Sequence, residues 1–226
     1  VLCSLGDASI TEGEVSEAFQ FAVLKQLPII YLVQDNNWGI SVTAEEARAM
    51  NAFECAAGFK GMNRVQVDGS DFEASYSVMK DVIAYVREKR KPYLVHAQVP
   101  LLGHHTSGVR KEFYRTDADW ARHLAHDPNP KLRKKLLELG VGGDELQQIE
   151  NEAGELVADD FSRAVSSPEP DPATVEDHVF APTTVTEERG ERNPAGAEKV
   201  IMVDAALFAI REIMEQHPEA VLYGQD

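Results

Sequence analysis

Two short polar stretches, Gly6-Asp7-Ala8 and Asp35-Asn36-Asn37-Trp38-Gly39, decide the fold. Each directly follows an apolar run, Val-Leu-Cys-Ser-Leu at 1–5 and Ile-Ile-Tyr-Leu-Val at 29–33. Short apolar runs that end at turn residues are typical of buried β-strands. We therefore predict a strand at each run and a loop at each polar stretch.

The segment between the two runs has the pattern of an amphipathic helix. Thr11 and Glu14 have the spacing of a capping box, and Pro28 would end the helix. The apolar positions that share one face are Val15, Ala18, Phe19, Ala22 and Val23. A helix of this length between two strands predicts a crossover connection and parallel strands.

Parallel strands leave a sheet by the same edge, so Asp7 and Asn36 should emerge together. Open α/β sheets bind ligands at that edge. A carboxylate, an amide oxygen and nearby carbonyl oxygens suit magnesium that also holds a phosphate, and a helix N-terminus can face the anion. Glu12 and Glu14 would repel an anion there unless a cation lies between them. Ordinary turn chemistry explains the same residue types, so either stretch alone is weak support for a metal site.

The amino-acid composition limits which binding partners and which cellular compartment we expect for this protein. The net charge of -16 argues against nucleic acid and anionic membranes as partners. We find no apolar run long enough to span a membrane and no signal peptide. Cys3 and Cys55 form no disulfide framework and are predicted to be reduced, buried thiols. We therefore expect a cytoplasmic protein.

The chain after the second strand continues to alternate helices and strands. We predict helices at about 44–58 and 70–89, which begin at capping boxes of Thr43 with Glu46 and Ser70 with Glu73. The strands are predicted at 64–67 and 93–99. Phe72, Met79, Val82, Ile83 and Val86 should face inward. This order predicts an α/β fold, with a mostly parallel sheet and helices on both faces.

The second half has a different organisation. Helices are predicted at about 117–125, 131–139 and 144–165, with charged outer faces that favour solvated struts over sites. Residues 166–199 are rich in proline and charge, which is typical of a linker. A helix at 200–215 and a strand at 220–223 follow. We divide the chain into an α/β domain at 1–116, a helical extension at 117–165, the linker, and the start of a second α/β domain at 200–226.

The stretch at 102–115, Leu-Gly-His-His-Thr-Ser-Gly-Val-Arg-Lys-Glu-Phe-Tyr-Arg, follows a predicted strand closely and is rich in donors. Such a set at a sheet edge suits a diphosphate or a carboxylate. His104 and His105 are adjacent and would point to opposite sides, so we reject a zinc site. From these residues alone, the favoured interpretation is that the two histidines only support a loop.

Gly-Asp-Ala, followed after 27 residues (9–35) by Asn-Asn, resembles the thiamine-diphosphate motif. The fuller strings, 6–19 and 35–41, resemble the alpha part of 2-oxo acid dehydrogenases, closest to the branched-chain type. The resemblance implies a thiamine-diphosphate-binding fold and magnesium held by Asp7, Asn36 and the backbone oxygen of Trp38. A one-residue slip would exchange Asn36 for Asn37. The family usually has Gly in place of Ala8. The implied cofactor-binding residues are Gly6, Asp7, Ala8, Ser9, Asn36, Trp38, Gly39, Ile40 and His105.

Two further stretches resemble the same family. Gly-His-His-Thr at 103–106 is similar to Gly-His-His-Ser of the branched-chain alpha part, which implies that His105 contacts the diphosphate and is catalytic. Thr106 matches a serine that is phosphorylated in animal relatives, and we do not carry that regulation over. Residues 200–226 resemble the opening of the beta part. Because the chain begins within one predicted strand and ends directly after another, we expect a piece of a longer, fused protein.

The resemblance implies oxidative decarboxylation of a 2-oxo acid with thiamine diphosphate and magnesium. The acyl group would pass to a lipoyl group on a separate acyltransferase, and the full-length parent would form a homodimer. We expect no turnover from these 226 residues alone, because the activating glutamate belongs to the beta part and is not matched here. The alternatives are another thiamine-diphosphate enzyme of transketolase-like type and a non-catalytic magnesium–phosphate binding module.

Overall fold

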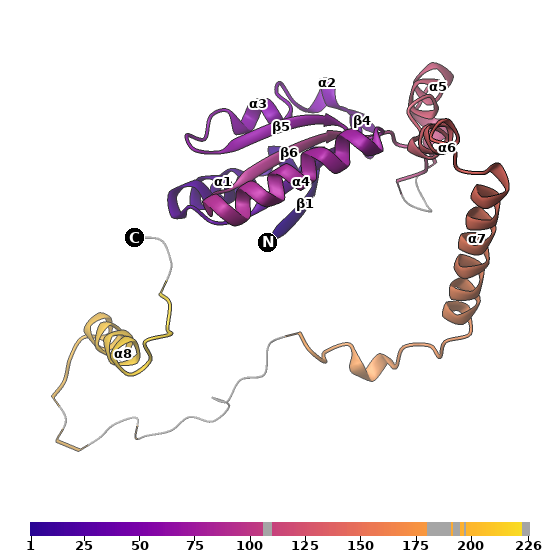
Figure 1. Cartoon of the computed structure of the whole chain (residues 1–226). Helices are drawn as coiled ribbons and strands as arrows, with labels where there is room; N and C mark the ends of the chain where they lie inside the picture. The colour runs from indigo at the N-terminus through magenta and orange to yellow at the C-terminus, as the bar shows by residue number, and fades with distance from the viewer. Residues whose placement is uncertain (106–109, 180–190, 192–194, 197, 223–226) are drawn as a thin grey trace. The chain divides into compact units, whose positions relative to one another are not determined.

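Four parallel strands form the sheet that organises the first part of the chain (Figure 1). The computed structural model describes residues 1–105, 110–179, 191, 195–196 and 198–222. The chain divides into two compact units, Val1–Ser166 and Ser167–Asp226. The sheet belongs to the first unit and has the order β1-β2-β6-β5. Its strands are β1 (Leu2–Gly6), β2 (Ile30–Asp35), β5 (Asn63–Asp68) and β6 (Tyr93–Gln98).

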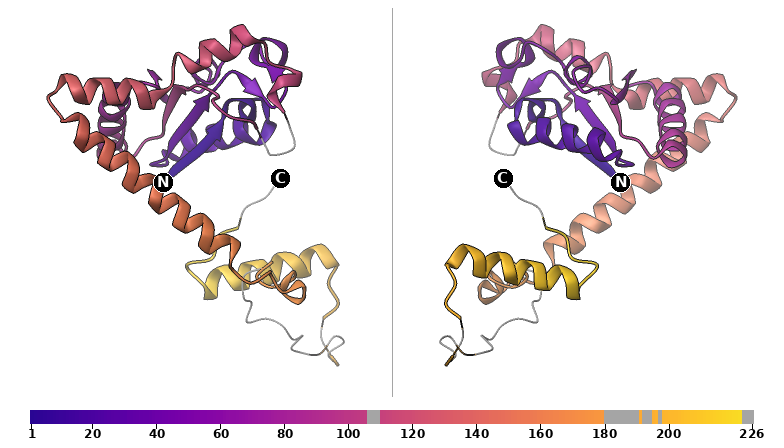
Figure 2. Two further views of the ribbon diagram at one scale, coloured as in Figure 1. Left: turned by 90° about the vertical axis from the view of Figure 1, so that its right-hand side faces the viewer. Right: turned by 90° about the vertical axis from the view of Figure 1, so that its left-hand side faces the viewer.

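Helices cover both faces of this sheet, as predicted (Figure 2). Helices α1 (Gly13–Lys25) and α3 (Ala52–Ala56) pack on one face, and α4 (Phe72–Lys89) packs on the other. The chain crosses the sheet in one direction from β1 to β5 and then turns back to β6. Because parallel crossovers are right-handed, this reversal moves the last connecting helix to the opposite face.

The strands end level with one another, and this register positions the loops that follow them. Gly6 is paired with Gln34, and both Asp35 and Asp68 are paired with Gln98. The turns after β1, β2, β5 and β6 therefore meet at one edge of the sheet.

The start of α1 differs from the sequence prediction. Asp7–Thr11 form a 3-10 turn (η1) directly after β1, and α1 begins at Gly13. The Thr11 hydroxyl donates to the carbonyl of Ala8 over 2.9 Å, so it does not cap the helix. The predicted capping box was wrong because Thr11 is itself the last residue of the 3-10 turn.

The single helix predicted at 44–58 is two short helices. The capping box of Thr43 and Glu46 is present, but α2 (Ala44–Ala47) ends after one turn. A second capping box, formed by Asn51 with Glu54, opens α3. A short antiparallel hairpin, β3 (Trp38–Gly39) with β4 (Val42–Thr43), precedes α2 and was not predicted.

Helix α4 has the predicted length but a different first turn. Asp71 caps it by accepting from the backbone N–H of Ala74, whereas Ser70 bonds to the Asp68 carboxylate. The capping box of Ser70 with Glu73 was therefore wrong. Phe72 was expected to face inward, but it is 60% exposed and stacks on Tyr76 at 6.2 Å. A first-turn residue lies beyond the edge of the core that Val82 and Val86 fill.

The predicted helices of the second half are confirmed. In the first unit, a 3-10 turn (η2, Lys111–Phe113) leads to α5 (Asp117–Leu124), α6 (Pro128–Glu138) and α7 (Gly143–Val165). The second unit contains a 3-10 turn (η3, Pro172–Thr174) and α8 (Met202–Gln216). The strand predicted at 220–223 is absent from 220–222, and Tyr223 lies outside the described residues.

Two further expectations concern the thiols and the membrane. Cys3 and Cys55 are free and only half-buried, since each lies near the margin of the core on the α1 face. Within the described ranges, no helix is both long and apolar enough to cross a lipid bilayer.

Candidate functional site

The loops that follow β1 and β2 lie against each other at the carboxyl edge of the sheet. A Cβ placed on Gly39 would lie 3.3 Å from the Cβ of Ala8, so the two predicted motifs are in direct contact. Ala8 has no positive φ, and alanine is therefore accommodated at this position without strain. The structure thus brings the Asp7 loop and the Asn36–Gly39 loop to one place.

Asp7 is buried and ion-paired. It is 3% exposed, and its carboxylate accepts from Nη1 of Arg48. Burial raises the pKa of Asp7, and the neighbouring Asp35 raises it further, while the Arg48 contact lowers it; the net shift is upward. The side-chain cation in contact with this carboxylate is Arg48.

Asp35 lies beside Asp7 and has several partners. Nη2 of Arg48 contacts its two oxygens at 2.9 and 3.0 Å, and the backbone N–H of Asn37 donates to it at 2.9 Å. Nε2 of His96 is 2.8 Å from the same carboxylate. Burial raises the pKa of Asp35, but the bonds from His96 and Asn37 and the charge of Arg48 lower it to about 2.

His96 is a buried link between Asp35 and the neighbouring strand. It is 1% exposed, and its Nδ1 lies 3.0 Å from the side-chain Nε2 of Gln66. Because an amide nitrogen can only donate, Nδ1 accepts from Gln66, and the Nε2–H group of His96 donates a hydrogen bond to the Asp35 carboxylate. A histidine inside an apolar strand run needs such a partner, so the sequence held a signal for this contact.

The loop after β2 is tightly turned. The side-chain oxygen of Asn36 accepts from the backbone N–H of Trp38 at 2.9 Å. Asn37 and Ile40 have positive φ values of 69° and 62°. Asparagine tolerates this conformation, but for isoleucine it is a strained one. The choice between Asn36 and Asn37 as a ligand stays a prediction.

Two buried donors beside this loop lack protein partners. Within the described part of the chain, the indole N–H of Trp38 and the hydroxyl of Tyr114 form no hydrogen bond. Their rings lie 5.5 Å apart. Buried polar groups without partners mark places where a ligand or water can bind.

The donor set fits a hard divalent cation. Asp7 offers a buried carboxylate, Asn36 an amide oxygen and Trp38 a backbone carbonyl, which are ligand types that magnesium accepts. No three His, Cys, Asp or Glu side chains are grouped to hold a metal in the ranges that the structure describes. In the described structure, the positive charge beside the Asp7 carboxylate is the guanidinium of Arg48.

A cavity of about 380 Å³ opens beside the Asp35–Asn37 turn. Its walls come from the ends of β2, β5 and β6 and from the end of α5 and the turn that follows it. The lining residues are Asp35, Asn36, Asn37, Asp68, Gln98, Val99, Pro100, Arg122, His123 and His126. The carboxyl edge of the sheet therefore has room for a small polar ligand.

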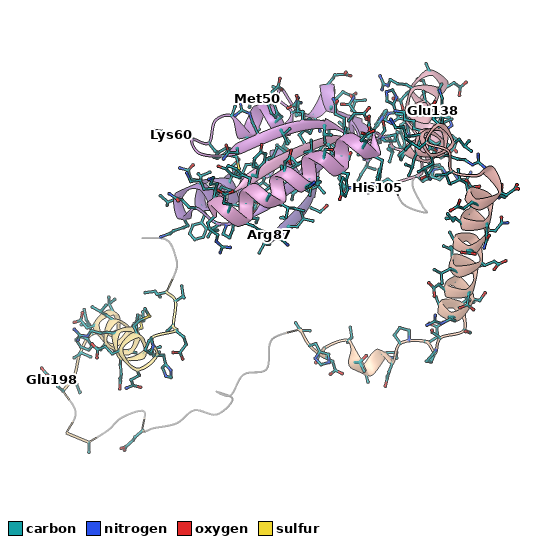
Figure 3. The ribbon with its side chains drawn as sticks, in the orientation of Figure 1. Met50, Lys60, Arg87, His105, Glu138 and Glu198 are labelled. Atoms are coloured by element: carbon teal, nitrogen blue, oxygen red, sulfur yellow. The ribbon has the colours of Figure 1, made fainter. Side chains whose placement is uncertain are left out.

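The histidines of the 102–115 stretch are not in contact with Asp7 or Asn36 among the described residues, although Tyr114 of the same stretch lies against Trp38. His105 is exposed and lies in the segment after β6 (Figure 3). Nε2 of His104 is 3.9 Å from a Glu112 oxygen. Among the described contacts, none connects His105 to Asp7 or Asn36, and Thr106 lies outside the described residues.

Sequence reasoning missed Arg48 and Asp35 as members of this group. Arg48 was placed inside a predicted helix, in an acidic run that gave no sign of burial. Asp35 was treated only as the end of the strand. A carboxylate next to a proposed cation site is expected to be buried, and a buried carboxylate needs a positively charged partner.

Comparison with known proteins gives the family. A profile described as "Dehydrogenase E1 component" matches residues 1–173. The pyruvate dehydrogenase E1 component subunit alpha of Rhizobium meliloti is 29% identical over 75% of this chain and 49% of its own length. The 3-methyl-2-oxobutanoate dehydrogenase subunit alpha of Mycobacterium tuberculosis is 33% identical over 64% of this chain and 39% of its own.

A transketolase structure from Campylobacter jejuni is similar to this chain with a TM-score of 0.42 and 22% sequence identity. The match covers 57% of this chain and 21% of the transketolase chain, and this similarity is too weak to support any argument about the fold. The chain spans about half or less of the length of the two subunits. The profile match covers most of the chain, including the Asp7 and Asn36 loops and the histidine loop, so the chain belongs to the dehydrogenase E1 component family.

Proposed function

We propose that this chain forms the magnesium and thiamine-diphosphate site of a 2-oxo acid dehydrogenase that decarboxylates its substrate oxidatively. The observation that carries the proposal is the buried Asp7 carboxylate at the end of β1, whose neighbour Ala8 lies against Gly39 in the loop of Asn36. Family membership supports the same reading. Relatives of both the pyruvate and the 3-methyl-2-oxobutanoate type match the chain, and we favour a branched-chain substrate because Gly-His-His-Thr at 103–106 resembles the branched-chain alpha part.

Each site residue then has a role. Asp7, Asn36 and the carbonyl of Trp38 would hold magnesium, while Gly6, Ala8, Ser9, Gly39 and Ile40 would line the diphosphate. His105 would donate to the cofactor and act in the reaction. Thiamine diphosphate, when bound, supplies the nucleophilic carbon and the electron sink; the protein binds it, orients it and excludes water.

The proposal extends to partners. The acyl group would pass to a lipoyl group on an acyltransferase. The disulfide of that lipoyl group would accept the electrons. Residues 200–226 would begin a fused second domain, and the intact protein would be a cytoplasmic homodimer. A second candidate is a magnesium–phosphate binding module without catalysis. The exposure of His105 favours it, as does the lack of a contact between His105 and Asp7 within the described part of the chain.

Titration calorimetry on the intact native protein tests the proposal. Thiamine diphosphate with MgCl2 should bind the wild type, and Asp7→Asn should weaken binding by about 100-fold, or about 2.7 kcal/mol. Asp71→Asn is the matched control, because Asp71 caps α4 and lies outside the proposed site. Turnover of 3-methyl-2-oxobutanoate would support the enzyme, binding without turnover would support the module, and no binding would contradict both.

A further inference from the structure

Two buried carboxylates at the proposed site share one cation of the protein itself. The side chains of Asp7 and Asp35 are 4% and 9% exposed, and that of Arg48 is 6% exposed. A buried carboxylate needs a positive charge or several hydrogen bonds to remain ionised. Arg48 supplies that charge to both carboxylates at once.

The guanidinium holds its two partners through different nitrogens. Nη1 contacts Asp7, and Nη2 contacts both oxygens of Asp35 at 2.9 and 3.0 Å. Arginine can do this because its donors form a planar fork, which a lysine ammonium lacks. The contact to one carboxylate can therefore be broken while the other remains.

The two carboxylates are not equally fixed. Asp35 is also bonded to His96 at 2.8 Å and to the N–H of Asn37 at 2.9 Å, so three groups hold it. For Asp7, the side-chain cation that contacts its carboxylate is Arg48. Asp35 is thus an anchor for the guanidinium, and Asp7 is the partner that can be exchanged.

We propose that Arg48 is a built-in counter-ion that occupies Asp7 in the metal-free protein and yields it to the divalent cation. This inference rests on the proposed function, since it assigns Asp7 to a metal. A guanidinium and a divalent cation on one carboxylate would repel each other strongly at low dielectric. Arg48 therefore competes with the metal, and it keeps its contact with Asp35 when the metal binds.

The consequence is that Arg48 lowers metal affinity while it stabilises the empty site. Removing its charge should tighten divalent binding and destabilise the metal-free fold. A merely structural arginine would also lower stability when replaced, but it would leave metal affinity unchanged or weaken it. Metal affinity is therefore the quantity that separates the two roles.

The test uses Mn2+ as the probe and follows free Mn2+ by electron paramagnetic resonance during titration of the full chain. Arg48→Met should bind Mn2+ about tenfold more tightly than the wild type, a difference of about 1.4 kcal/mol. Its melting temperature should be lower without metal and should rise more on adding MnCl2. Arg64→Met is the control, because Arg64 lies over the Phe53 ring at 4.7 Å and not at the site.

If Arg48→Met does not fold, Arg48→Lys is the variant to titrate with Mn2+. A single ammonium cannot hold both carboxylates in the same way, so Mn2+ affinity should rise by a smaller factor. Equal or weaker Mn2+ binding by a folded Arg48 variant would overturn the inference.

Asp7→Asn separates this inference from the proposed function. If Mn2+ binding needs Asp7 but Arg48→Met does not tighten it, only the role of Arg48 is wrong. If Asp7→Asn binds Mn2+ as tightly as the wild type does, Asp7 is not a metal ligand. The role proposed for Arg48 is then wrong as well.

Discussion

Ile40 has the least favourable backbone conformation at the proposed site. It is the first residue of the β3–β4 hairpin loop, it has a φ of 62°, and it is 47% exposed. This conformation costs a β-branched residue about 1–2 kcal/mol, whereas asparagine adopts it readily. Strain of this kind is retained at functional positions.

Ile40→Asn should therefore raise the free energy of unfolding by about 1 kcal/mol and weaken thiamine-diphosphate binding. Urea unfolding and calorimetry measure the two effects. Val42→Asn is the control, because Val42 is also exposed but has no positive φ, and it should give no gain. If Ile40→Asn lowered the free energy of unfolding, the backbone conformation of Ile40 would not be a strained one.

His123 should make stability depend on pH. Its Nδ1 accepts from the backbone N–H of Leu101 at 2.9 Å. Burial lowers the pKa of His123, with smaller contributions from the charges of Arg115 and Arg122, while Asp119 opposes them. The folded protein therefore prefers the neutral ring more than the unfolded chain does.

The sign follows from linkage. The stabilisation is complete above the unfolded pKa of about 6.5, and it is lost as the pH falls from there toward the folded pKa. Urea unfolding between about pH 7.5 and 5.5 should show a decline that is smaller in His123→Asn, whose amide oxygen can accept from Leu101. An unchanged slope in His123→Asn would contradict the assignment.

At the scale of elements, the β5–α4 turn depends on a close approach of two backbones. A Cβ on Gly69 would lie 2.6 Å from Cγ1 of Val99 and 2.9 Å from the carbonyl oxygen of Gln98. Gly69→Ala should therefore lower the free energy of unfolding by about 1–3 kcal/mol, measured by urea unfolding. Gly154→Ala, within α7 and with nothing near its Cβ, should instead raise it by about 0.5–1 kcal/mol. Equal changes in the free energy of unfolding for the two variants would contradict the steric clash expected at Gly69.

The sequence predicted the type and order of the main helices and strands, because their periodicity reflects burial directly. It failed at two of the three predicted capping boxes, whereas the box of Thr43 with Glu46 is present. Thr11 and Ser70 have the right spacing for a capping box, but each hydroxyl bonds elsewhere. Spacing reports only which residues could form a cap, whereas the entering backbone decides which one does.

Two cores on opposite faces of the sheet stabilise the first unit. Phe19 lies at the centre of the core under α1, is fully buried, and meets Tyr31 and Phe59 edge-on at 4.7 and 5.5 Å. Phe19→Ala should destabilise the chain by about 3–5 kcal/mol. Phe21→Ala on the same helix should cost little, because Phe21 is 55% exposed. Thermal or urea unfolding gives both values, and similar losses would contradict this description of the core.

The candidate site was only partly readable from the sequence. The pattern of two apolar runs placed Asp7 and Asn36 at one sheet edge because parallel topology requires it. The ion pairs of Arg48 and the His96 link depend on how α2 ends and on strand order, and these are tertiary features. His105 was assigned by resemblance, and its role stays a prediction.

The proposed function requires that Asp7 and Asn36, from neighbouring parallel strands, bind one divalent cation. Its most direct test is a crystal structure of the intact protein with Mn2+ and thiamine diphosphate, with the metal located by anomalous scattering. We expect one Mn2+ at a bonding distance of roughly 2.0–2.3 Å from a carboxylate oxygen of Asp7, Oδ1 of Asn36 and the carbonyl oxygen of Trp38. A metal bound elsewhere, or held through Asn37 with Asp7 still paired to Arg48, would contradict it.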